Sequence, residues 1–403
     1  MARSPFEVAD VIREHAETFL QVFGDVVGSA KRRVMRRLTA CRTAALGGHV
    51  ESCDHCGYER IAYNSCRDRH CPKCQASACA EWVEAREGDL LPVPYFHVVF
   101  TVPPAIAAIA LQNKKVIYGI LMRAAADALL QIAADPKHLG AEIGVLSVLH
   151  TWGQTLTHHP HVHCLVPGGG LGADRRTWIA CRPGFFLPVR VLSAVFRGKF
   201  LEQARRAFAR GELKFQGKLE HLADPGDFHR LLKSTYEHDW VVYSKPPFGG
   251  AGQVLRYLAR YTHRVAIANS RIVAMSEGKV SFRYKDYARS SRPRTMTLAG
   301  VEFLRRFLQH VLPKGFVRIR SYGFLANSVR AARLAACRTA LGVAAHPPDS
   351  PSSGEAASST SCRRCPACKL GTLVVGERLP PFSLRLLRPR SPPVDGGQFL
   401  RHG

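Results

Sequence analysis

The stretch "HHPHVHCLVPGGG", residues 158–170, places four histidines within six residues, and the chain then turns apolar and reaches three glycines. Side chains alternate between the two faces of a β-strand, so His161 and His163 would share one face while Val162 and Cys164 point the other way. The pattern predicts a strand that packs one face into a core and presents two imidazoles on its other face.

The segments on either side of this stretch alternate between strand-like and helix-like patterns. Short apolar runs bounded by Pro or Gly indicate strands, and longer runs with apolar residues at three-and-four spacing indicate helices. In chain order we expect a strand at 93–103, a helical segment at 105–135, strands at 142–152 and 161–170, a helix at 188–211 and a strand at 238–250. The order β-α-β-β-α-β predicts an α+β fold, a ferredoxin-like antiparallel sheet with helices on one face.

Shifts in composition divide the chain into four regions. Residues 1–48 form an expected N-terminal helical segment, 49–92 a cysteine-rich zinc-binding domain, and 93–345 the domain built on the sheet. This third region is expected to end with a helix at 252–263, a hairpin at 270–287 and a helix at 301–313. From His346 the sequence is rich in Pro, Ser, Ala and Gly, so 346–403 is expected to be a flexible, cysteine-containing tail that is largely disordered.

The charge of the chain points to a polyanionic partner. Lys and Arg number 57 against 31 Asp and Glu, a formal net charge of +26. Nucleic acid is the usual partner of so basic a chain. The alternative is a protein that is basic only because arginine is abundant in its genome. The charge does not say which nucleic-acid sequence is bound.

The sequence also gives an expectation for the cellular compartment of the protein. No apolar run reaches the roughly 18 residues that span a bilayer, and "MARSPFEVADVIREH" lacks the basic-then-apolar pattern of a signal peptide. We therefore expect a cytoplasmic protein without a membrane partner. In that compartment cysteines stay reduced, and the odd total of 13 cysteines also disfavours a disulfide framework.

The segment "CDHCGYERIAYNSCRDRHCPKC", residues 53–74, holds two C-x2-C pairs. Each pair can chelate one ion from a tight turn, and four thiolates complete the closed tetrahedron of a structural zinc site. The expected ligands are Cys53, Cys56, Cys71 and Cys74, and Cys66, His70 and Cys79 remain as spare donors. In the tail, "CRRCPACKLG" at 362–371 holds three more thiols without a clear fourth donor, so a second zinc site there stays open.

The histidines of the opening stretch suit a metal ion of another kind. Two imidazoles on one strand face can chelate one divalent cation, although such a pair can also be an accident of packing. Gln154, His158 and His159 lie close by in the sequence and favour metal binding. With only His161 and His163 fixed, the site would stay open to substrate, as a catalytic metal requires.

A tyrosine pair stands in "GQVLRYLARYTHRVAIAN", residues 252–269. Tyr257 and Tyr261 are one helical turn apart and would share a face. They can equally belong to a core stripe, since Val254 and Leu258 continue the same spacing. The surrounding cations favour phosphate binding instead; these are Arg256, Arg260, His263 and Arg264.

Together these motifs give the chain a family resemblance. The cysteine-rich segment, "HPHVHCLVPGGG", "RYLARYTHRVAIAN" and "VLPKGFVRIRSYGFLAN" occur in this order. In this respect the chain resembles the HUH (His–hydrophobic–His) transposases of the rolling-circle insertion sequences, family ninety-one, of the two-tyrosine type. The resemblance covers roughly 5–345, and residues near 380–403 depart from it.

The resemblance implies a chemistry and assigns residues to it. His161 and His163 would hold Mg or Mn, with Gln154 as the third ligand, and the cation would polarise a scissile phosphate of single-stranded DNA. Tyr257 or Tyr261 would then attack, giving a 5′-phosphotyrosine link and a free 3′-OH. Arg256, Arg260 and Arg264 would hold the strand. The expected partners are the single-stranded ends of the element and its target, and the oligomeric state is left open.

Two other functions fit part of the sequence. A plasmid replication initiator or a relaxase would use the same nicking chemistry, but the N-terminal zinc module favours a transposase. A zinc-dependent DNA-binding regulator without catalysis would account for the charge and the cysteines. It would leave the histidine strand and the tyrosine pair without a role.

Overall fold

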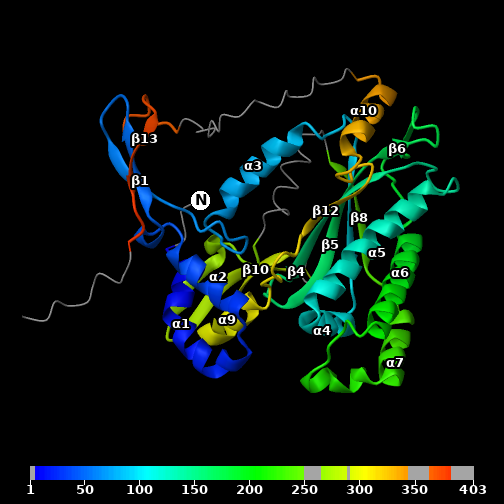
Figure 1. The fold of residues 1–403 in the computed structure, drawn as a ribbon, viewed down its shortest axis with the longest axis horizontal. Coiled ribbons are helices and arrows are strands. Elements are labelled where there is room, and N and C mark those ends of the chain that lie inside the picture. Colours follow the sequence, from blue (N-terminus) through cyan, green and yellow to red (C-terminus); the bar gives the residue numbers. More distant parts are fainter. Residues whose placement is uncertain (1–4, 249–264, 288–290, 344–362, 383–403) are drawn as a thin grey trace, which may run out of the picture. The chain divides into compact units, whose positions relative to one another are not determined.

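A computed structural model describes residues 5–248, 265–287, 291–343 and 363–382. The chain divides into two compact units. The large unit comprises Met1–Thr39 and Arg67–Glu355, and the small unit comprises Ala40–Cys66 and Ala356–Gly403. Residues 67–92, which we expected in the zinc-binding domain, therefore pack with the large unit. Figure 1 shows the elements of both units.

The large unit is organised around a five-stranded antiparallel sheet in the order β12-β4-β5-β3-β8. The strands are β3 Tyr95–Thr101, β4 Gly144–Trp152, β5 His158–Pro167, β8 Val242–Phe248 and β12 Ile319–Gly323. Four of them are the strands expected from the sequence, and their order is that of a ferredoxin-like sheet. The expected α+β fold is confirmed, and β12 adds a fifth strand at the β4 edge.

Four helices accompany the sheet. They are α4 Pro104–Gln112, α5 Lys114–Ala134, α6 Val189–Ala209 and α7 Pro225–Tyr236. Alternate residues of the strands, among them Phe96, Phe100 and Val162, are fully buried in the same core cluster as apolar residues of all four helices. Figure 1 shows α5 and α6 lying along the sheet. One sheet face is thereby covered, and the opposite face carries the histidines.

Helix α5 is the most apolar helix of this layer. Among the described residues it is the one helix that is long and apolar enough to cross a membrane, with a mean hydropathy of 1.5. However, 67% of that window is buried inside the protein. Ile117, Leu121 and Leu129 all lie in the core against the sheet. The composition of α5 is accounted for by its place in the core.

The large unit contains further elements beyond this layered core. It contains α1 Val8–Phe23, α2 Ser29–Ala40, α3 Gln75–Glu87, β6 Gly169–Leu171, β7 Trp178–Ala180, β9 Ile272–Ser276, β10 Lys279–Asp286, β11 Arg292–Ala299, α9 Gly300–Leu308 and α10 Arg330–Ala340. The short 3-10 helices are η1 Gly24–Val26, η3 Gly217–Ala223 and η4 Asn269–Arg271. The hairpin expected at 270–287 is β9 and β10, which β11 extends to a three-stranded antiparallel sheet.

The small unit joins two distant parts of the chain in one sheet. Its elements are η2 Ala44–Leu46 and the strands β1 Gly48–Cys53, β2 Glu59–Tyr63 and β13 Leu373–Leu379, in the order β13-β1-β2. Strand β13 lies antiparallel to β1, with Cys53 opposite Leu373 and Gly48 opposite Leu379. Residues 363–382 therefore differ from the largely disordered tail that we expected. Their order comes from pairing with β1, a contact that local composition does not reveal.

Candidate active site

Three histidines meet on the sheet face opposite α4, α5, α6 and α7, where His150 is buried and His161 is partly exposed. His150 lies near the end of β4, directly opposite His161 of β5 in the register. His163 lies two residues further along β5, and one ring nitrogen from each of the three histidines lies within 4.8 Å of the others. The ring centroids of His150 and His163 are 4.4 Å apart. Three imidazoles converging in this way can hold one divalent ion.

The histidines of β5 lie on both faces of the sheet, because side chains alternate along a strand. His158 points to the helical face, where its Nε2 shares a hydrogen bond of 2.7 Å with the hydroxyl of Tyr118. Burial, with a smaller contribution from the positive charge of Lys114, lowers the pKa of His158 to about 4. His158 is therefore a neutral core histidine at neutral pH, while His161 and His163 face the opposite side.

Neighbouring groups orient two rings of the cluster. The Nδ1–H of His161 donates to the backbone carbonyl oxygen of His159 over 2.7 Å, because a carbonyl can only accept. With the proton on Nδ1, the lone pair that His161 can offer a metal is that of Nε2. The Nδ1 of His163 shares a hydrogen bond of 2.8 Å with Nε2 of His97, a buried residue of β3. Burial lowers the pKa of His97 to about 4, and nearby Lys245 contributes.

Gln154, the third ligand implied by the family resemblance, is hydrogen-bonded elsewhere. Its Nε2 donates to the hydroxyl of Tyr287 over 3.3 Å, and its Oε1 accepts from the backbone N–H of Lys285 over 3.4 Å. His150, which the sequence analysis did not single out, lies in the cluster instead. The sequence signal for His150 was its position near the end of an expected strand, but the strand register was needed to place it opposite His161.

The other expected active-site residues cannot be located. Tyr257, Tyr261, Arg256, Arg260 and Arg264 lie within 249–264, outside the residues that the structure describes. Their roles remain predictions from the sequence. The described chain on the N-terminal side of this segment is β8, which pairs with β3, the strand that carries His97.

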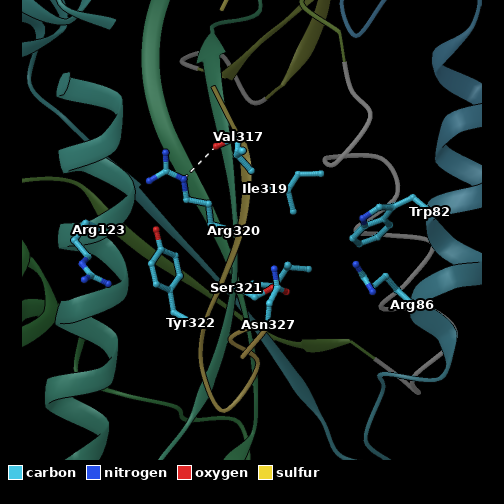
Figure 2. A pocket seen from close by; sticks show the side chains of 10 residues that line it. Trp82, Arg86, Arg123, Val317, Ile319, Arg320, Ser321, Tyr322 and Asn327 are labelled. Atoms are coloured by element: carbon cyan, nitrogen blue, oxygen red, sulfur yellow. Dashed lines mark hydrogen bonds between the residues drawn. The ribbon is translucent and has the colours of Figure 1, made fainter. Parts of the chain in front are cut away.

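A second feature of the large unit is a pocket of about 710 Å³ beside the edge strand β12. Figure 2 shows Trp82 and Arg86 of α3 on one side of this strand, and Tyr322 and Arg123 on the other. The rest of the lining is Leu146, Val317, Ile319, Arg320, Ser321 and Asn327. The pocket thus combines two aromatic rings with three arginines and no carboxylate.

The pocket and the histidines share one sheet. Leu146, which lines the pocket, is four residues before His150 in β4 and so lies on the same face. At about 3.3 Å per strand residue, roughly 13 Å separates the two positions along β4. A polymer that runs along this face could contact both.

The cysteines fall into the two units. In the small unit, the Sγ atoms of Cys53, Cys56, Cys365 and Cys368 all lie within 4.8 Å of one another. Cys53 and Cys56 thus meet two tail cysteines that the sequence analysis left without an assigned site. Cys71 and Cys74, their expected partners, are buried in the large unit before α3. Zinc binding by Cys71 and Cys74 stays a prediction from their spacing.

Comparison with known proteins gives the family. A family model described as a transposase zinc-binding domain matches residues 11–102, and one described as a putative transposase matches 144–333. The chain is 54% identical over 384 residues to a putative transposase, y4qJ, of Sinorhizobium fredii, covering 94% of this chain and 96% of that protein. The chain belongs to the IS91 family of transposases. Among the functions that the sequence analysis considered, the comparisons confirm a transposase. They do not support a replication initiator or a relaxase.

More distant similarities extend the comparison. The transposase of insertion sequence IS801 from Pseudomonas savastanoi pv. phaseolicola is 29% identical over 309 residues, covering 73% of this chain and 70% of that one. The structure of the conjugative relaxase TrwC in complex with oriT DNA matches 62% of this chain and 74% of its own, at 15% identity and a TM-score of 0.24. That score is too low to support a conclusion about this transposase.

Proposed function

We propose that this transposase nicks and rejoins single-stranded DNA at a divalent cation held by His150, His161 and His163, with Tyr257 or Tyr261 as the nucleophile. The observation that carries the proposal is the three-histidine cluster on the sheet face opposite the helices. A purely DNA-binding protein would have no use for such a cluster. A transposase must cleave and join DNA strands, and that reaction can use a metal bound by these histidines.

The three imidazole nitrogens favour some metals over others. Imidazole nitrogen suits transition metals better than Mg²⁺, which prefers oxygen ligands. Of the two cations implied by the family resemblance, Mn²⁺ therefore fits three histidines better than Mg²⁺. When bound, the cation would polarise the scissile phosphate and stabilise the negative charge that develops on it.

The family resemblance assigns the covalent step to the tyrosines. The hydroxyl oxygen of Tyr257 or Tyr261 attacks the phosphorus, and the bond between phosphorus and the 3′ oxygen breaks. The tyrosine proton is lost and the 3′ oxygen gains one, which leaves a 5′-phosphotyrosine and a free 3′-OH. Rejoining reverses the step with another 3′-OH, and the bond energy is conserved without ATP.

The pocket beside β12 supports a single strand as the substrate. Bases stack on exposed aromatic rings when they are unpaired, and cationic side chains hold the backbone. Trp82 could supply a ring and Arg86 a charge on the histidine side of β12, while Tyr322, Arg123 and Arg320 lie on its other side (Figure 2). We propose that the strand runs from this pocket along the sheet face to the histidines. The DNA ends of the element and its target would be met in the cytoplasm, at the nucleoid.

The test is a nicking assay with labelled single-stranded DNA from the ends of the element and Mn²⁺. We expect a covalent adduct that resists SDS. His150→Ala should reduce it on the order of 10²–10³-fold, as expected for loss of electrostatic stabilisation at the phosphate. Gln154→Ala is the matched control and should form the adduct normally. Normal nicking by His150→Ala with loss in Gln154→Ala would reverse the ligand assignment, and no adduct in the wild type would overturn the function.

A further inference from the structure

The four cysteines of the small unit have the spacing of a metal site. Cys53 and Cys56 flank the turn after β1, and Cys365 and Cys368 flank the turn before β13. The Sγ atoms of Cys53 and Cys368 are 3.7 Å apart, and so are those of Cys56 and Cys365. A disulfide would need about 2.05 Å. With Zn–S bonds of about 2.3 Å, a tetrahedron has S–S edges of about 3.8 Å, which agrees with the observed separation.

The two turns are fitted to each other around the sulfur atoms. The backbone N–H of His55 donates to Sγ of Cys53, and that of Gly371 donates to Sγ of Cys368, both over 3.4 Å. N–H donors of this kind stabilise thiolates. The carboxylate of Asp54 accepts from the backbone N–H of Thr372 over 2.8 Å and so joins one turn to the other.

Gly371 shows how closely the turns approach. A Cβ atom at this position would lie 2.5 Å from Oδ1 of Asp54 and 2.6 Å from Sγ of Cys53. Both distances are shorter than van der Waals contact, so only glycine fits between the turns. The turn at Cys365–Cys368 is therefore complementary in shape to the turn at Cys53–Cys56, although the two are far apart in the sequence.

Among the described residues, the small unit has only a small apolar cluster to support its strand pairing. Its core cluster consists of Cys53, Cys365 and Leu373, with Cys368 packed against them. A cluster of this size buries too little apolar surface to hold three short strands together. Metal binding can supply the missing folding free energy, as it does in other small zinc modules.

We propose that Cys53, Cys56, Cys365 and Cys368 hold one structural Zn²⁺ that fastens the C-terminal segment to the N-terminal zinc-binding domain. The matched zinc-binding family model ends at residue 102, so the tail cysteines lie outside it. The tail is then the second half of a zinc ribbon whose first half contains β1 and β2. Its function is to hold β13 against β1.

The proposal is tested by metal analysis of the full-length transposase, purified under reducing conditions. Cys365→Ser and Cys368→Ser should each lower the zinc content by one equivalent per chain. Cys181→Ser, which changes a partly buried cysteine of the large unit, is the control and should keep the wild-type content. Unchanged zinc in both tail variants would overturn the proposal, as would a Cys53–Cys368 or Cys56–Cys365 disulfide in place of zinc.

A conservative variant separates ligand loss from misfolding. In Cys365→His the imidazole can replace the thiolate, so one zinc should be retained. After exchange of Zn²⁺ for Co²⁺, this variant should lose part of the thiolate-to-cobalt charge-transfer absorption of the wild type, because one of four sulfur ligands is replaced. A cobalt spectrum identical to that of the wild type would show that Cys365 is not a ligand.

Discussion

The histidine cluster of the large unit and the cysteine cluster of the small unit are assembled in opposite ways. His150, His161 and His163 come from two adjacent strands within 14 residues of sequence and lie on the sheet face opposite the helices. The cysteine pairs Cys53–Cys368 and Cys56–Cys365 join residues that are 315 and 309 positions apart. The first cluster includes the partly exposed His161 beside the buried His150, and the second closes around its own sulfurs. The comparison separates the site that we propose for chemistry from the site that we propose holds the chain together.

The largest effect should come from removing both candidate nucleophiles. In Tyr257→Phe/Tyr261→Phe the ring is kept and the attacking oxygen is lost, so the covalent DNA adduct should fall to background. Each single variant should keep some adduct, since one helical turn would bring both hydroxyls to the same phosphate. Folding and zinc content should not change. An adduct that persists in the double variant would show that the nucleophile is another residue.

Metal removal should distinguish the two clusters directly. A weak chelator should strip the histidine site, which has three neutral ligands, abolish nicking, and leave the fold intact, with activity restored by added Mn²⁺. A high-affinity zinc chelator should in addition release the cysteine-bound metal and unfold the small unit. Hydrogen exchange in 48–63 and 373–379 measures that unfolding. Unchanged exchange there after complete zinc removal would contradict a structural role for the metal.

A smaller effect is expected from the buried neighbour of the cluster. His97→Ala removes the hydrogen bond to Nδ1 of His163, so the Mn²⁺ concentration for half-maximal nicking should rise about 10–100-fold. The rate at saturating Mn²⁺ should stay near that of the wild type. His97→Gln, whose amide can make the same hydrogen bond, should recover part of the affinity. A loss that saturating Mn²⁺ does not reverse would point to a structural role instead.

The smallest effect concerns the pocket beside β12. Trp82→Ala should weaken binding of single-stranded DNA about tenfold, within the range measured for base stacking on aromatic rings. Trp82→Phe should restore much of it, and binding to duplex DNA should not change because paired bases cannot stack on the ring. Arg205→Gln, an exposed position of α6 away from the pocket, is the control. Equal losses for single-stranded and duplex DNA would contradict stacking.

The same comparison shows what the sequence could predict. Strands β3, β4, β5 and β8 were expected in the right order because short apolar runs bounded by Pro or Gly are a local signal. The shared face of His161 and His163 follows from the alternation of side chains along a strand. The family was recognisable because its motifs occur in a fixed order along the chain.

What the sequence could not predict depends on register and long-range pairing. His150 joins the cluster only because β4 pairs with β5 so that residue 150 faces residue 161. Cys365 and Cys368 meet Cys53 and Cys56 only because β13 pairs with β1. Spacing within a short segment favoured Cys71 and Cys74 as partners, since two nearby C-x2-C pairs are typical of a zinc site.

The pairing of β1 with β13 has a consequence for the synthesis of the protein. Strand β1 leaves the ribosome early, whereas its partner is among the last residues to be made. At roughly 5–20 residues per second, the 315 residues between Cys53 and Cys368 take on the order of 15–60 s to translate. Throughout that time β13 is not available to pair with β1, and Cys53 and Cys56 lack the other two thiols of the cluster. A chain cut short before residue 365 can never complete the ribbon, so interrupted copies of the gene would yield products that are left open to proteolysis.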